Sequence, residues 1–66
     1  MNLNKLTNII DDSGIKKSKL SKDLGISDSS LRNKLNGKTD FTIKEINTLA
    51  MTLHLSAAVC TEVFFS

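Results

Sequence analysis

Residues 17–37 constrain the fold of this chain more than any other stretch. They indicate two short helices joined by a tight turn at Gly25. Leu20 and Leu24 form an apolar pair at i, i+4 in the first of these helices, and glycine suits the left-handed conformation that follows a last helical turn. Ser27 is a favourable N-cap for the second helix. The stretch therefore predicts a compact two-helix unit with a tight turn.

The remaining sequence also favours helices over a sheet. The chain has 66 residues, no Tyr, Trp or Pro, and only three Phe as aromatic residues. β-Branched alternation is nowhere sustained, so strands are not indicated. A chain of this length builds one small domain with a thin core. We expect an all-α fold, a compact bundle of five short helices, forming a single domain over residues 1–66.

Capping residues and apolar spacing place the other helices. The first is predicted from Asn2, a capping residue, to about Asp12, with Ser13–Gly14 ending it. The second helix of the central unit is predicted to start after Ser27 and to run to Asn36. The last is predicted from Ala57 to about Phe64, after a cap at Ser56.

The fourth helix has the clearest local signature. Thr42 and Glu45 form a capping box, and Phe41 is placed to pack on Ile46 across the first turn. The stripe expected to be buried comprises Ile43, Ile46, Leu49, Ala50 and Leu53.

Charge is distributed unevenly along the chain. Residues 16–38 carry seven basic against two acidic side chains, a net charge of +5, and the rest carries two basic against five acidic, a net charge of −3. A basic centre between acidic ends is expected when one face of a protein meets a polyanion. A solvated lysine face without a partner would have the same composition.

Three lysines break a local rule at the start of the second helix. Lys16, Lys17 and Lys19 lie where the helix dipole disfavours positive charge by roughly a few tenths of a kcal/mol each, and no acidic residue offsets them there. A bound phosphate would satisfy the unpaired backbone N–H groups and neutralise the lysines. The alternative is that these side chains are simply exposed and hydrated.

The helix after Ser27 carries short polar side chains opposite its leucines. Serine and asparagine are mediocre helix formers, and an ordinary solvent face more often carries Glu, Lys or Ala. Asn33 could pair with adenine, and Arg32 could reach guanine or a phosphate. Asp28 could accept a hydrogen bond from cytosine but would repel phosphate. The pattern matches a helix-turn-helix, whose second helix lies in the DNA major groove.

These residues resemble a known family, the lambda-repressor-like, Cro/repressor-type helix-turn-helix domains of bacteriophages. The resemblance covers nearly the whole chain and includes a last helix that ends in Phe64–Phe65, as in small Cro-like proteins. Its matching segments are Leu20–Ser21, Leu24–Ser27, Leu31, Leu35–Lys38 and Phe41–Ile46.

The resemblance implies roles for individual positions. In that family the residues after the turn read bases, which here implies Asp28, Ser29 and Asn33, with Ser30 and Arg32 nearby. It also implies a backbone or edge-base contact for Lys17 and phosphate contacts for the segment after that helix, with Asn36, Lys38 and Thr39 as candidates. The charge at the start of the preceding helix adds Lys16 and Lys19 to the candidate phosphate contacts. Two positions depart from the family pattern: Ser21 stands where alanine is more usual, and Asp28 where glutamine or a basic residue is common.

Dimerisation is a further implication of the resemblance. Such proteins bind near-palindromic operators as dimers, with half-sites about 34 Å apart. In this chain we expect the dimer contact to come from the last helix and tail, with Val63, Phe64 and Phe65 as candidates. The alternative is that one or both Phe complete the core, which we favour for Phe64.

Other chemistries have little support in the sequence. His54 and Cys60 are the only soft metal ligands and cannot complete a tetrahedral site or a catalytic triad, so we expect no metal, no cofactor and no enzymatic activity. No apolar run approaches the ~20 residues of a membrane span, and no secretion signal is recognisable. We expect a protein of the bacterial cytoplasm, associated with the nucleoid.

The sequence thus leaves two functions in competition. The first is a sequence-specific transcriptional regulator, a Cro-like repressor that occupies operator DNA as a homodimer. The second is a protein-interaction module, either a modulator of a separate repressor or an antitoxin, because one fold serves several roles. Asp28 in the polar face and the tail at Phe65 favour the second.

Overall fold

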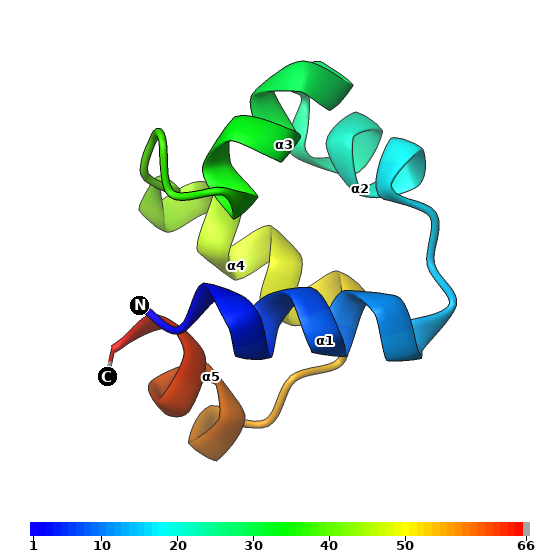
Figure 1. The fold of residues 1–66 in the computed structure, drawn as a ribbon. Coiled ribbons are helices and arrows are strands. Elements are labelled where there is room, and N and C mark those ends of the chain that lie inside the picture. Colours follow the sequence, from blue (N-terminus) through cyan, green and yellow to red (C-terminus); the bar gives the residue numbers. More distant parts are fainter. Residues whose placement is uncertain (66) are drawn as a thin grey trace.

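Five helices make up the part of the chain that the structure describes. A computed structural model describes residues 1–65 and contains no strand within them. The helices are α1 (Leu3–Ser13), α2 (Lys17–Leu24), α3 (Asp28–Leu35), α4 (Ile43–Thr52) and α5 (Ala57–Phe64), as Figure 1 shows. This confirms the predicted all-α bundle.

Four of the helices begin at side-chain caps that the sequence predicts. In each case the side-chain oxygen accepts a hydrogen bond from a backbone N–H of the first turn, which satisfies one of the donors that a helix start leaves unpaired. Thr42 and Glu45 form the complete capping box. α2 begins after Lys16 without a side-chain cap. The capping residues are Asn2, Ser27, Thr42 and Ser56.

The turn between α2 and α3 depends on Gly25. Its φ angle of 72° lies in the left-handed region, and its N–H donates to the carbonyl oxygens of Ser21 and Lys22. No atom lies within 4 Å of the position that a Cβ would take at Gly25. Glycine is therefore favoured here by the backbone conformation and not by crowding.

The core draws on every helix. Within residues 1–65, six side chains are fully buried, and together they fix the orientation of the five helices around one centre. Each contributes burial worth about 1.5–3 kcal/mol relative to an exposed position. Leu31 is the residue through which α3 is anchored, and α2 packs against both α3 and α4. The six are Leu6, Ile10, Leu20, Leu31, Leu49 and Val63.

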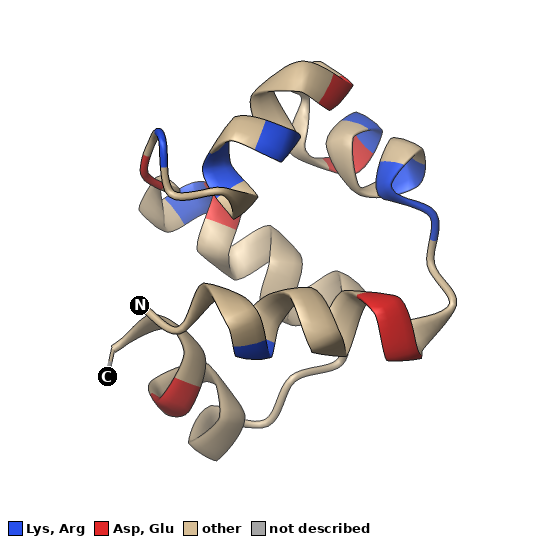
Figure 2. Cartoon of the chain, in the orientation of Figure 1, with Lys and Arg blue, Asp and Glu red and all other residues tan. Residues whose placement is uncertain are grey.

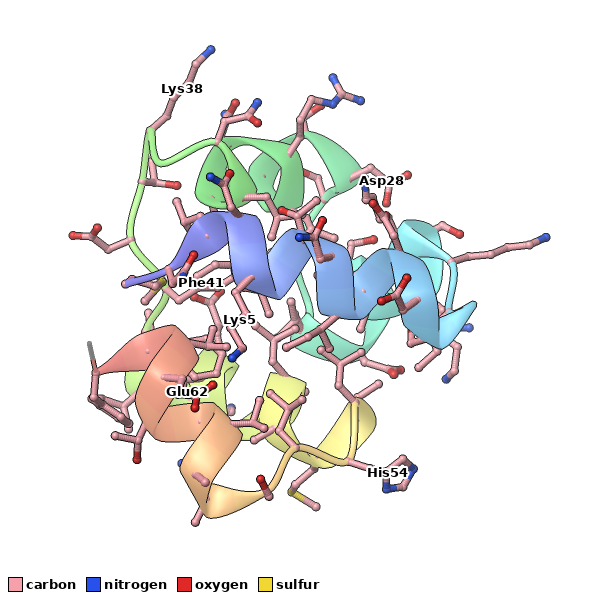
Figure 3. The ribbon with its side chains drawn as sticks, turned by 60° about the horizontal axis from the view of Figure 1, so that its bottom comes forward. Lys5, Asp28, Lys38, Phe41, His54 and Glu62 are labelled. Carbon is pink, nitrogen blue, oxygen red and sulfur yellow. The ribbon has the colours of Figure 1, made fainter. Side chains whose placement is uncertain are left out.

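The two ends of the chain are joined on the side of the molecule away from α3. The backbone N–H of Asn2 donates to the carbonyl oxygen of Val63 over 2.6 Å, and Lys5 forms an ion pair with Glu62. Figures 1 and 3 show α5 across the molecule from α3. The outer face of α3 is consequently not covered by the C-terminal helix.

Two sequence expectations about burial need correction. Ile43 was expected in the buried stripe of α4, but its side chain is 70% exposed. It lies in the first turn, where side chains tilt toward the helix start and so project past the core, and Phe41 fills the space there instead. Val63 was a candidate for a dimer contact, but it is buried in the core of its own chain. Phe64 is buried as well, in agreement with the core position favoured for it, and of these three tail residues Phe65 is the exposed one.

Candidate nucleic-acid interface

The outer face of α3 presents polar groups that lack partners. Ser29, Arg32 and Asn36 are exposed and Asn33 is half-buried. Within the described residues none of these four side chains makes a hydrogen bond or an ion pair. Their donors and acceptors are therefore available to a ligand that lies along α3.

The other two predicted base-contacting residues are engaged within the chain. The hydroxyl of Ser30 lies 3.0 Å from Oγ of Ser27, the N-cap of α3. The carboxylate of Asp28 accepts a hydrogen bond from the hydroxyl of Ser21 on α2. The sequence did not predict this last bond, although both residues stood out as departures from the family pattern.

A hollow of about 270 Å³ lies where the start of α2 faces α3. Its floor is apolar, formed by Leu31 and Leu35, and its rim carries both signs of charge. Lys17 and Arg32 are the cations of this rim and Asp28 is its anion. The hollow thus adjoins the polar face of α3 and places Lys17 beside it.

The lysines at the start of α2 do not act as one group. Lys16 and Lys19 line a second, more open hollow with Lys22 and Asp23, whereas Lys17 lines the first. Lys19 also forms an ion pair with Asp23 over 3.3 Å. Of the three, Lys17 is the one that the structure brings together with α3. No acidic residue lies in the first turn of α2, as the sequence indicated.

The loop after α3 adds a further cation. Lys38 and Thr39 are exposed, and Figure 3 shows the Lys38 side chain projecting away from the molecule. The Lys38 backbone N–H donates to the carbonyl oxygen of Asn33 over 2.9 Å, which fixes the loop against the end of α3. Figure 2 shows basic residues on α2, α3 and this loop, with single acidic residues among them and further acidic residues at the end of α1.

Lys34 differs from the other basic residues of this region. Its ammonium donates to the carbonyl oxygen of Asp40 over 2.8 Å and lies 3.2 Å from Oε1 of Glu45. It also lies 5.9 Å above the centre of the Phe41 ring. The side chains of the Lys34–Glu45 pair are only 13% and 11% exposed. The +5 charge of residues 16–38 therefore overstates the charge offered to a polyanion, because Lys34 is neutralised internally.

The environment of Glu45 keeps its carboxylate ionised. Burial by itself raises the pKa of this carboxyl group, but a hydrogen bond from the Thr42 backbone N–H and the ammonium of Lys34 outweigh it. The pKa therefore lies below its usual value of 4.5. An ionised Glu45 in turn holds Lys34, so that the end of α3 and the start of α4 are joined by one ion pair.

The described residues were also inspected for a metal site and a membrane-spanning helix. Among the described residues, no group of three or more His, Cys, Asp or Glu side chains is placed to hold a metal ion. His54 is exposed in the loop after α4, and Cys60 is half-buried on α5. None of the helices described is both long and apolar enough to span a membrane.

The arrangement defines a class of protein. Two helices joined at Gly25, the second with an uncovered polar face and flanked by Lys17 and Lys38, form a helix-turn-helix built to bind DNA. A family model described as the Cro/C1-type HTH DNA-binding domain matches residues 5–58. The chain belongs to this family and is a DNA-binding domain of a transcriptional regulator. No curated protein and no solved structure matches it.

Proposed function

We propose that the protein is a sequence-specific repressor of the bacteriophage Cro type, which places α3 in the major groove of an operator. The observation that carries this proposal is the outer face of α3, where Ser29, Arg32, Asn33 and Asn36 have no partners within the described chain. Short side chains let a helix approach base edges closely. The Asn33 amide can donate to N7 of adenine and accept from its N6 amino group.

Roles on the DNA follow from this placement. We assign base contacts to Ser29, Arg32 and Asn33, with Asp28 and Ser30 at the edge of the contact because each already bonds within the chain. Direct phosphate contacts are assigned first to the exposed side chains next to α3, and Lys16 and Lys19 serve as more distant charges. The first set comprises Lys17, Asn36, Lys38 and Thr39.

A homodimer on a two-fold operator is part of the proposal. Of the three tail residues considered, Phe65 is 66% exposed and available for a contact between two copies. It follows α5, on the opposite side of the molecule from α3, so such a contact leaves α3 uncovered (Figure 1). The family match ends at residue 58, so this contact would be a feature of this chain's own C-terminal segment.

A protein-interaction role is the second candidate. Its supporting observation is that Ile43, Met51 and Phe65 are large apolar side chains with 70%, 77% and 66% exposure. A modulator of another repressor, or an antitoxin, would use such side chains to bind its partner and would need little DNA affinity of its own.

Selection of bound duplexes from a random pool separates the two candidates. The purified protein is incubated with the pool near physiological salt, and bound DNA is sequenced after several rounds. The repressor proposal expects enrichment of a two-fold symmetric site. Recovery of DNA that is salt-sensitive but not enriched in sequence would reject it in favour of a partner that supplies the specificity.

A further inference from the structure

The hydrogen bond between Ser21 and Asp28 joins the two helices of the motif at the DNA-facing end of α3. Ser21 is 3% exposed and lies on α2, while Asp28 is the exposed first residue of α3. We propose that Ser21 determines base preference without touching DNA. Its hydroxyl holds Oδ1 of Asp28, so that Oδ2 is presented to the amino group of a cytosine in the major groove. This inference rests on the proposed function.

The bond is not needed to satisfy the buried hydroxyl. Oγ of Ser21 also lies 2.9 Å from the carbonyl oxygen of Ser18, one turn earlier in α2. A hydroxyl has a single proton, so that carbonyl alone would satisfy it. Asp28 Oδ1 therefore competes with that carbonyl for the proton, and as the charged acceptor it forms the stronger bond, which fixes one oxygen of the Asp28 side chain.

The bond is not needed to cap α3 either. Ser27 is the N-cap, and its hydroxyl oxygen accepts from the backbone N–H of Ser30 over 3.1 Å. Asp28 follows the cap, where the helix dipole favours a carboxylate. Within the described residues Oδ2 of Asp28 makes no hydrogen bond and remains an available acceptor.

The surroundings allow a carboxylate to approach DNA. Lys17 and Arg32 line the same hollow as Asp28, one from α2 and one from α3. Two cations beside one anion offset the repulsion that phosphates would exert on Asp28 alone. A carboxylate oxygen accepts from the N4 amino group of cytosine, and neither guanine nor thymine carries an amino group at its major-groove edge. Adenine carries one, but its neighbouring N7 acceptor disfavours a carboxylate, so cytosine is the preferred base. Because the Ser21 hydroxyl already holds Oδ1, the Asp28 side chain loses less conformational entropy when it binds a base.

Three variants and the unmodified protein test the inference by the same random-pool selection. Asp28→Asn replaces an acceptor by a group that also donates, and Ser21→Ala removes the hydroxyl that holds it. Thr48→Val is the control, since it removes a half-buried hydroxyl that bonds a carbonyl of its own helix, α4. Thermal melting by circular dichroism confirms that each variant is folded.

The expected result is a shared change at one base pair of each half-site. Asp28→Asn and Ser21→Ala both lower the preference for cytosine there by about fivefold or more, the lower end of what one base contact is worth. All other positions keep their preference, and Thr48→Val changes none. A loss of fold alone would instead weaken binding to every sequence.

Three results would overturn the inference. If Asp28→Asn changes one position and Ser21→Ala does not, Asp28 reads its base without help from Ser21. If Asp28→Asn changes no position, Asp28 is not a base-reading residue although the protein is sequence-specific. If the unmodified protein enriches no sequence, the proposed function fails as well, and the three results are distinguishable from one data set.

Discussion

Replacing Lys34 by methionine should destabilise the fold more than replacing an exposed lysine would. The change removes the hydrogen bond to the Asp40 carbonyl and leaves the Glu45 carboxylate, 11% exposed, without its cation. Breaking a buried ion pair by removing one partner costs about 3–5 kcal/mol, whereas exposed pairs are worth about 0–1 kcal/mol. This pair is mostly covered but reachable by water, so we expect Lys34→Met to cost about 2–3 kcal/mol.

A double-mutant cycle isolates the pair. Glu45→Gln keeps an oxygen that can accept from the Thr42 N–H, so its cost should be about 1 kcal/mol. The double variant lacks both charges, so no unpaired charge remains in it. Its loss in free energy of unfolding should therefore be smaller than the sum of the two single losses by about 1 kcal/mol or more. Urea unfolding at neutral pH, followed by circular dichroism, measures all four proteins.

Lys44→Met is the matched control for this cycle. Lys44 is exposed on α4 and has no ion pair within the described residues, so its replacement should change the free energy of unfolding by less than about 0.5 kcal/mol. The reasoning is refuted if Lys34→Met costs no more than Lys44→Met, or if the Lys34 and Glu45 substitutions are additive.

Four further predictions concern the interface, the acid response and the tail. Asn33→Ala should lower affinity for the selected site by ~1–3 kcal/mol and leave an unrelated duplex unaffected, as measured by fluorescence anisotropy. Lys17→Ala should weaken both duplexes alike and reduce the slope of log affinity against log salt by about one, and an unchanged slope would remove Lys17 from the phosphate contacts. Because folding lowers the pKa of Glu45, its contribution is fully present above the usual value of 4.5 and is lost as the pH falls through the lower, folded-state value. Acid titration should therefore show that the difference in free energy of unfolding between wild type and Glu45→Gln becomes smaller as the pH falls below 4.5. A difference independent of pH would contradict the lowered pKa of Glu45. Phe65→Ser should leave the circular dichroism spectrum unchanged, since Phe65 is 66% exposed, and should shift sedimentation toward the monomer.

Local signals in the sequence were sufficient to predict the helices. Four of the five described helices start at a side chain that bonds a backbone N–H three residues later, as at Thr42 and Ser56, and such bonds need no tertiary partner. The turn at Gly25 was predictable for the same reason, because the left-handed conformation is a property of one residue. The apolar pair at i, i+4 in α2 includes Leu20, which is fully buried in the core.

Features that depend on contacts between helices were not predictable. The bonds Ser21–Asp28 and Lys34–Glu45 cross from one helix to another, and no spacing rule relates such residues. In the sequence, Lys34 was therefore counted among the seven basic side chains of residues 16–38, although its side chain is only 13% exposed. The exposure of Ile43 had the same origin, since periodicity places a residue on a side of the helix but does not say how far the core extends along it.

The central claim, that α3 and the residues beside it form the DNA interface, is tested most directly by nuclear magnetic resonance. Backbone amide signals of labelled protein are followed while the selected duplex is added. The largest shifts are expected on residues 28–36, with further shifts at Lys17 and Lys38. Shifts confined to α4 and α5, with α3 unaffected, would contradict it.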